Sequence, residues 1–211
     1  MDFARKDEAW VARNLTKPHV SIWKELRGEY VFELDTSEKQ TYYSIQKVNT
    51  FTPPTNEKAF LLSQLSKNIE NACIKLRRYR LAVKEAVFFL NRQDFSHQGV
   101  RVKFSRATSV PMDLINVAEE FFDEIFKPGT VYRATGAVLF SLEPNEIRQL
   151  DLFGELFRAK QVLTLYDVVD EINKQFGKHT VYLASSVRVL AGTSLNQVRW
   201  EKGWRPKCLR I

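Results

Sequence analysis

The sequence predicts an α+β protein built around a ferredoxin-like βαββαβ domain, in which two helices cover one face of a four-stranded sheet. Four stretches between residues 43 and 142 have the alternating or Val- and Phe-rich pattern of strands. Two stretches with helical spacing separate them in the required order. The chain has 211 residues, 44% of them apolar, which is enough to bury a substantial core.

Two short helices are expected before this domain, over residues 2–15 and 18–30. Pro18 opens the second helix, which stops near Gly28. Helices of this size bury little surface by themselves, so residues 1–32 are expected to be the end of something larger. Residues 33–42 have no sustained period and are interpreted as a linker.

The domain itself is predicted over residues 43–143 and begins with a strand, a helix and a strand. Tyr43–Phe51 is the first strand, closed by Thr52-Pro53-Pro54. Leu and Ile recur at helical spacing over residues 56–79. Ala82–Leu90 is rich in Val and Phe, which is typical of a strand.

The second half repeats this order. Val100–Arg106 alternates apolar and polar side chains with a period of two. Pro111 opens a helix whose inward residues continue to Ile125 and which Pro128-Gly129 ends. Val131–Leu142 is the last strand.

Both helices must cover the same face of the sheet, because their apolar stripes need burial there, and the other face is left open. The side chains expected on that open face are Arg101, Lys103 and Ser105, then Arg133 and Thr135 opposite the row Tyr132, Ala134, Val138 and Phe140, and Ser44, Gln46 or Lys47 from the first strand. Such a face carries cations and hydroxyls without a large apolar patch. It suits a phosphate backbone better than a protein core.

Charge is distributed unevenly along the chain, which has 32 basic and 25 acidic residues and a net charge of +7. Residues 67–111 hold 10 basic and 3 acidic side chains, whereas residues 112–155 hold 3 basic and 9 acidic ones. A distinct cationic face would attract polyanions. The alternative, that these charges are ordinary solvated helix faces, stays open at this point.

The sequence offers no convincing active site. His19, His97 and His179 lie far apart, and none has a partner at metal-ligand spacing. There is no Walker loop and no Gly-rich dinucleotide turn. The acidic runs at residues 119–124 and 167–171 are expected to be solvated helix faces. No metal and no cofactor are therefore expected in this chain.

An intracellular, cytoplasmic protein is expected. Cys73 and Cys208 are too few for a disulfide framework and form no CxxC motif. No apolar run is long enough to span a membrane, and the first residues do not resemble a signal peptide.

After the sheet, residues 144–160 are expected to form a loop and residues 161–211 a tail. The tail contains a predicted helix over residues 162–176, with Leu165, Val169, Ile172 and Phe176 inward, and a short strand at Val181–Leu183. From about Ser185 the sequence is basic and weakly patterned, so no structure is predicted there.

The loop contains the pentapeptide Gln149-Leu150-Asp151-Leu152-Phe153. A fully buried large apolar side chain is worth ~1.5–3 kcal/mol, so something should cover these residues. The cover is either the protein's own sheet or a partner, whose hydrophobic pocket would take Leu152 and Phe153 while Gln149 binds its rim. The pentapeptide matches the bacterial sliding-clamp-binding pattern Gln-Leu-x-Leu-Phe.

Together these features resemble the C-terminal half of Y-family translesion DNA polymerases of the DinB/UmuC type, and most closely the UmuC branch. The similar segments are, in order, Leu26-Arg27-Gly28-Glu29 at the end of the thumb, Ser44-Ile45-Gln46 with Thr50-Phe51 at the start of the little finger, Tyr132–Leu139 in its last strand, Gln149–Phe153 at the clamp motif, and residues 165–183 in a UmuC-like tail.

The resemblance implies a little-finger domain that grips primer–template DNA without sequence specificity in error-prone repair synthesis. The residues then expected to touch phosphates are Ser44, Lys84, Arg101, Lys103, Arg106 and Arg133. The implied partners are DNA, the sliding clamp through Gln149, Leu150, Asp151, Leu152 and Phe153, a UmuD-type subunit and a recombinase filament.

The family's catalytic palm and its fingers have no counterpart in this sequence, and its thumb is only partial. Two-metal phosphoryl transfer needs carboxylates that hold two cations ~3.5–4 Å apart. The chain is therefore expected to be inactive alone, as a fragment or the product of a shortened gene, and Mg²⁺ is expected only with the palm.

The alternative is a stand-alone ferredoxin-like module that binds RNA. Such modules stack bases on aromatic side chains exposed on the central strands. Phe88, Phe104 and Phe140 are the candidates here, but all three could belong to the core. A ferredoxin-like enzyme ranks third, because no nucleophile, metal set or phosphate loop supports it.

Overall fold

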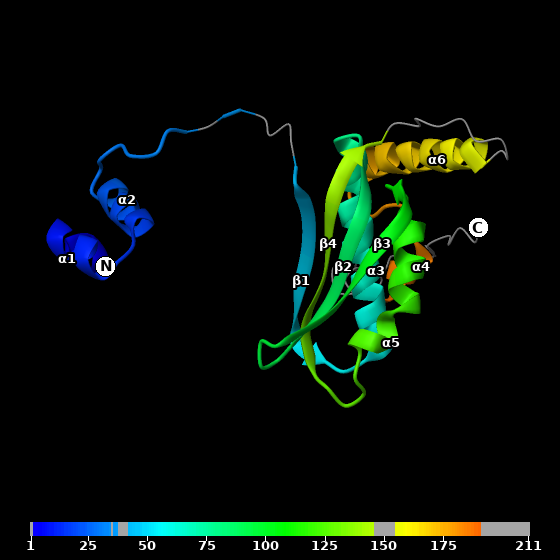
Figure 1. Ribbon diagram of the computed structural model, residues 1–211, viewed down its shortest axis with the longest axis horizontal. Helices are drawn as coiled ribbons and strands as arrows, with labels where there is room; N and C mark the ends of the chain where they lie inside the picture. Colours follow the sequence, from blue (N-terminus) through cyan, green and yellow to red (C-terminus); the bar gives the residue numbers. More distant parts are fainter. Residues whose placement is uncertain (1, 35, 38–41, 146–154, 191–211) are drawn as a thin grey trace, which may run out of the picture. The chain divides into compact units, whose positions relative to one another are not determined.

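The computed structural model describes residues 2–34, 36–37, 42–145 and 155–190 (Figure 1). The chain divides into two compact units, Met1–Gln40 and Thr41–Ile211. No helix within the described ranges is both long and apolar enough to cross a membrane.

The first unit is a pair of short helices. Its elements are the 3-10 turn η1 (Phe3–Arg5), α1 (Glu8–Asn14) and α2 (Lys17–Leu26). Asp7 caps α1 by accepting a hydrogen bond from the backbone N–H of Trp10 at 3.0 Å. Both predicted helices are present, but the first begins only at Glu8, after the separate turn η1, and the second stops four residues early. Gly28 has φ +89°, in the left-handed region that ends helices.

The second unit contains the predicted βαββαβ series. Its elements are β1 (Ser44–Thr55), α3 (Lys58–Arg78), β2 (Leu81–Arg92), β3 (His97–Thr108), α4 (Pro111–Glu120), α5 (Phe122–Ile125), β4 (Tyr132–Pro144), α6 (Glu155–Phe176) and the 3-10 turn η2 (Ala184–Ser186). The strands lie in the order β1-β4-β2-β3, and every neighbouring pair is antiparallel. β4 therefore separates the parallel strands β1 and β2, and β2 separates β3 and β4. This confirms the split βαβ arrangement.

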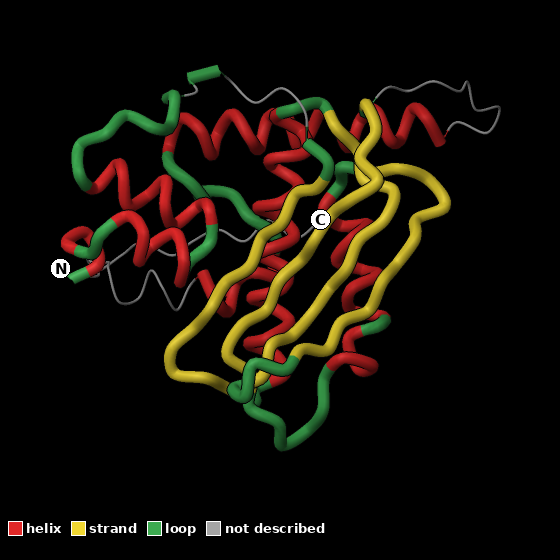
Figure 2. The backbone as a smooth tube through the Cα atoms, turned by 60° about the vertical axis from the view of Figure 1, so that its left-hand side comes forward, coloured by secondary structure: helices red, strands yellow, loops and turns green. Residues whose placement is uncertain are grey.

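Helices α3 and α4 lie on one face of the sheet and enclose the core against it (Figures 1 and 2). Both layers contribute fully buried side chains, among them Leu61, Leu65, Ile69, Leu76, Phe88, Leu90, Leu114 and Leu139. In the described part of the second unit the opposite face of the sheet carries no helix, as the sequence predicts.

Strand β1 continues past the predicted closure and includes Pro53 and Pro54. Prolines are tolerated there because β1 is an edge strand, whose outer N–H groups have no ladder to join. The pairing of β1 with β4 shifts in register between Thr50 and Thr55. The helix predicted from Pro111 is also interrupted, at Phe121, between α4 and α5.

Helix α6 begins inside the predicted loop and is held against α3. Arg77 of α3 donates from Nε and Nη2 to the Asp170 carboxylate at 2.7 and 2.8 Å, and its guanidinium lies 4.9 Å from the centre of the Tyr166 ring. Tyr166 and Asp170 therefore face α3. Leu165 and Phe176 were predicted to face inward, but they are 48% and 67% exposed.

The predicted strand at Val181–Leu183 is absent from the described structure, and this segment leads instead into η2. Asn173 exchanges two hydrogen bonds with the backbone of Val181, at 2.8 and 2.9 Å. Glu70 of α3 accepts from the backbone N–H of Leu183 at 3.1 Å and from the hydroxyl of the fully buried Ser186. Side chains thus satisfy the backbone that a strand ladder would otherwise pair.

Candidate nucleic-acid interface

The uncovered side of the sheet, called the open face below, presents four rows with one residue from each strand. In the order β3, β2, β4, β1 the rows are Lys103, Glu85, Phe140 and Ser44; Arg101, Val87, Val138 and Gln46; Gly99, Phe89, Gly136 and Val48; and His97, Asn91, Ala134 and Thr50. Neighbouring rows are about 7 Å apart along the strands. The cations Arg101 and Lys103 therefore lie on the β3 edge, the centre is mostly apolar, and the β1 edge is mostly polar and uncharged.

The predicted face of β3 is confirmed at Arg101 and Lys103, and most of the prediction for β1 is confirmed. Arg101 and Lys103 are exposed on the open face, while Val102 packs against the core on the other side. On β1, Gln46 is on the open face. Lys47, predicted as a possible addition to it, pairs with the core residue Ala137 and points to the helix side.

On β4 the prediction is confirmed for Tyr132, which lies in the core, but it is wrong for the residues after Arg133. Thr135 is fully buried, and Val138 and Phe140 are on the open face. The cause is a bulge at Arg133, because Arg92 pairs with Tyr132 while the preceding residue of β2 pairs with Ala134. Each residue after the bulge has the opposite orientation to that expected. The centre of the open face is consequently apolar, where cations and hydroxyls were expected.

Arg101 joins the charged edge of the open face to its apolar centre. Its Nε and Nη2 donate to Oε2 of Glu85 at 3.1 and 2.6 Å, and its guanidinium lies 4.7 Å from the centre of the Phe140 ring. The hydrogen bond from Arg101 lowers the pKa of Glu85 from its ordinary value, so this carboxylate is ionised at neutral pH. The Arg101 side chain is still 66% exposed and can reach a ligand.

The other predicted phosphate contacts are spread beyond this edge. Ser44 lies in the row of Lys103, at the β1 end. Lys84 donates from Nζ to the Ser105 carbonyl at 2.6 Å, and Arg106 is exposed next to it on β3. The structure therefore brings Arg101 and Lys103 together on the β3 edge of the open face and places Ser44 on the opposite edge, at β1. Lys84 and Arg106 lie past one end of this face.

Arg133 lies at the opposite end, beside the turn between β2 and β3. Its guanidinium is 4.3 Å from the centre of the Phe95 ring, and Phe95 is 76% exposed. This residue is separated from Arg101 by the full length of the apolar centre.

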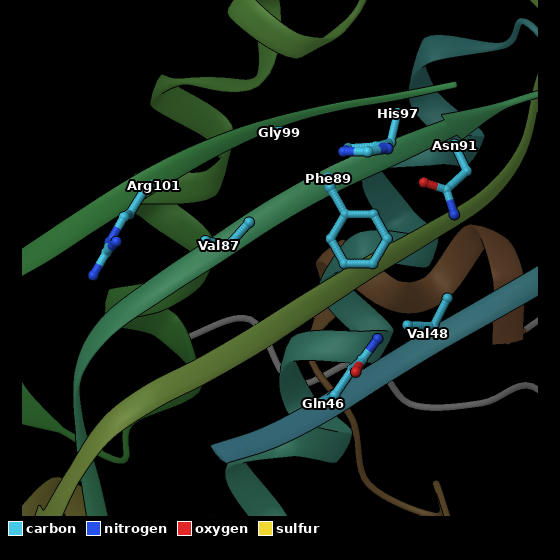
Figure 3. Close-up of a pocket in the computed structure, with 8 residues that line it drawn as sticks. All are labelled: Gln46, Val48, Val87, Phe89, Asn91, His97, Gly99 and Arg101. Atoms are coloured by element: carbon cyan, nitrogen blue, oxygen red, sulfur yellow. The ribbon is translucent and has the colours of Figure 1, made fainter. Parts of the chain in front are cut away.

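Sequence reasoning missed Phe89, which is the aromatic residue at the centre of the open face. It lines a groove of about 510 Å³ that also includes Arg101, His97 and Gln46 (Figure 3). Successive side chains of a strand point to opposite faces of the sheet, so the fully buried Phe88 implies that Phe89 is on the open face. Two adjacent phenylalanines in one strand were the signal that could have found it.

The predicted clamp-binding residues Gln149, Leu150, Asp151, Leu152 and Phe153 lie outside the described residues. They fall between the end of β4 at Pro144 and the start of α6 at Glu155. This motif stays a prediction from sequence. Within the described part of the chain, no three His, Cys, Asp or Glu side chains are grouped so that they could hold a metal ion.

Comparison with known proteins identifies a matching family domain and several similar proteins. The impB/mucB/samB family C-terminal domain matches residues 43–152. Protein UmuC of Salmonella typhimurium is 29% identical over 102 residues, which are 48% of this chain and 24% of that protein. Protein ImpB of Salmonella typhimurium is 23% identical over 190 residues, 87% of this chain and 44% of that protein.

Among solved structures, the complex of the beta-clamp processivity factor and the little finger domain of PolIV contains a similar chain. The two align with a TM-score of 0.37 and 20% identity, over 52% of this chain and 98% of that one. This chain spans between about a quarter and under half of the length of the curated relatives it matches (24–44%).

Proposed function

This chain belongs to the impB/mucB/samB family and carries its C-terminal domain, the little finger of a Y-family translesion DNA polymerase, and we propose that it binds primer–template DNA through the open face and a sliding clamp through Gln149–Phe153. The observation that supports the DNA-binding part is the exposed pair Arg101 and Lys103 on the edge of an uncovered sheet. Phosphate contacts of this kind fix a protein on DNA without reading its sequence.

The strength of this binding depends on how many cations reach phosphates. The five proposed cations are Lys84, Arg101, Lys103, Arg106 and Arg133. Four or five contacts give a slope of log affinity against log salt between about −3.6 and about −4.5. Affinity for primer–template DNA should then fall about 150- to 500-fold between about 50 and about 200 mM salt.

Fluorescence anisotropy with labelled primer–template DNA tests this part. The variant Arg101→Ala/Lys103→Ala should reduce the slope by between one and two contacts, or about 0.9 to about 1.8, because Glu85 competes with phosphate for Arg101. Lys174→Ala is the matched control, because Lys174 is an exposed cation on α6, away from the open face. An affinity that does not change over this salt range, or a double variant that binds like the control, would contradict the proposal.

The clamp-binding part is tested separately with an immobilised bacterial sliding clamp. We expect micromolar binding that Leu152→Ala/Phe153→Ala abolishes, because these two side chains enter the hydrophobic pocket. Asp151→Ala is the control, since the clamp pattern accepts any residue at that position. Equal binding by the double variant and the control would remove the motif from the proposal.

In this proposal the chain contributes binding and no catalytic group. Mg²⁺ and the carboxylates that hold it belong to a palm, for which the sequence has no counterpart.

A further inference from the structure

Phe89 occupies an unusual position on the open face, because the residues opposite it on both neighbouring strands are glycines. A Cβ atom on Gly136 would lie 2.5 Å from Cζ and 2.9 Å from Cε1 of the Phe89 ring, and one on Gly99 would lie 3.1 Å from the Phe89 Cβ. The ring therefore leans across β4 into the space that a side chain at position 136 would fill. Gly136 leaves room for the Phe89 ring because it has no side chain.

The Phe89 ring, which lies over Gly136, presents a flat surface to solvent. Figure 3 shows it nearly face-on from the open side of the sheet, and Phe89 is only partly buried. No side chain stands beside it on β3, because Gly99 is the neighbour there. Flat rings such as nucleobases can stack on an aromatic ring that is exposed on a central strand and has only glycines beside it.

Polar groups surround this platform on the adjacent rows. His97 and Asn91 lie one row away on one side, and Gln46 and Arg101 lie one row away on the other (Figure 3). Imidazole and amide groups can bind the edge of a nucleobase, and the guanidinium can bind its phosphate. Along β3, Arg101 and Lys103 provide two cations about 7 Å apart for a chain of phosphates.

We propose that the open face holds single-stranded DNA, with one unpaired base stacked on Phe89 and the adjoining phosphates on Arg101 and Lys103. The inference rests on the proposed function, since both use the β3 edge, and adds a mode that duplex cannot use. Paired bases are already stacked on one another, so a duplex reaches the cations but not the ring. The cationic edge favours a polyanion over an apolar peptide in this groove.

The test uses the full chain with a labelled oligothymidine and with a duplex of the same length. Phe89→Leu should weaken oligothymidine binding about 5- to 150-fold, which is the range for losing one stacked base, and leave duplex binding unchanged. Phe89→Tyr keeps the aromatic face and should restore single-strand binding. Thermal unfolding confirms that each variant is folded.

Three outcomes would overturn the inference. In the first, Phe89→Leu binds oligothymidine like the unaltered chain. In the second, it weakens duplex and single strand equally. In the third, an oligouridine of the same length binds more than tenfold more tightly than oligothymidine, which would assign the platform to RNA. If the unaltered chain did not bind duplex DNA at all, the proposed function would be overturned instead. Failure of the inference and failure of the proposed function therefore give different results.

Discussion

Glu85 should weaken the binding of DNA to the open face. Its carboxylate lies 2.6 Å from Nη2 of Arg101 and directly opposite Lys103 in the sheet. A phosphate that binds Arg101 must therefore compete with this carboxylate. Glu85→Gln removes the negative charge and keeps the shape of the side chain, so Arg101 becomes fully available.

The expected gain is that of one additional phosphate contact. With Arg101 held by Glu85, four cations contribute and the salt slope is about −3.6; with Arg101 free it becomes about −4.5. A change of about 0.9 corresponds to about eightfold tighter binding at about 0.1 M salt. Both quantities come from one anisotropy titration of primer–template DNA at several salt concentrations.

A matched control separates this local effect from a general change in charge. Glu119→Gln makes the same charge change on the exposed part of α4, which lies on the covered side of the sheet. It should alter affinity less than twofold and leave the slope as it was. The reasoning is refuted if Glu85→Gln binds no more tightly than Glu119→Gln, or if its slope stays the same.

Three further predictions concern the support of this surface. Burial raises the pKa of Glu70 from 4.5 to about 6, so the folded chain keeps a proton that the unfolded chain has lost, and the free energy of unfolding should fall by about 2 kcal/mol as pH rises through that window. In urea unfolding, Glu70→Gln should lose this dependence, and a wild-type-minus-variant difference that is constant with pH would contradict the assignment. Asp170→Ala leaves the Arg77 guanidinium, whose side chain is 6% exposed, without its carboxylate and should cost about 3 kcal/mol, whereas Glu171→Ala on the exposed side should cost under about 0.5 kcal/mol. Gly136→Ala should cost only about 1 kcal/mol, because the side-chain ends of Phe89 and Val48 can move, yet it should weaken single-strand binding by unseating the ring; unchanged oligothymidine affinity would contradict this.

The two faces of β3 could be predicted from sequence because the signal is local. On β3, Val100 and Val102 alternate with Arg101 and Lys103, and the alternation alone assigns each face correctly. On the central strand β4 both faces are largely apolar, so alternation carries little information. The bulge at Arg133 then reverses the orientation of the residues that follow, and a bulge depends on pairing with β2 that the sequence of one strand does not contain.

The contacts of the tail could not be predicted for a different reason. Arg77 and Asp170 are 93 residues apart in sequence, and Glu70 and Ser186 are 116 apart. Each is an ordinary polar residue at its own position. Only the packing of α6 and η2 on α3 pairs them, and this packing also turns Leu165 to solvent although helical spacing favours it as an inward residue.

The two parts of the open face should contribute independently to binding, and this can be measured. Lys103 and Phe89 lie two rows apart, about 14 Å along the strands, which is beyond the distance at which substitutions usually couple. Lys103→Ala removes one phosphate contact and should reduce the single-strand salt slope by about 0.7. Phe89→Leu removes stacking and should lower affinity with no change in slope. In Phe89→Leu/Lys103→Ala the losses in single-strand affinity should therefore multiply, while duplex DNA responds to Lys103 alone. A smaller salt slope in Phe89→Leu by itself would mean that the ring positions the phosphates, and the two parts of the surface would then act as one.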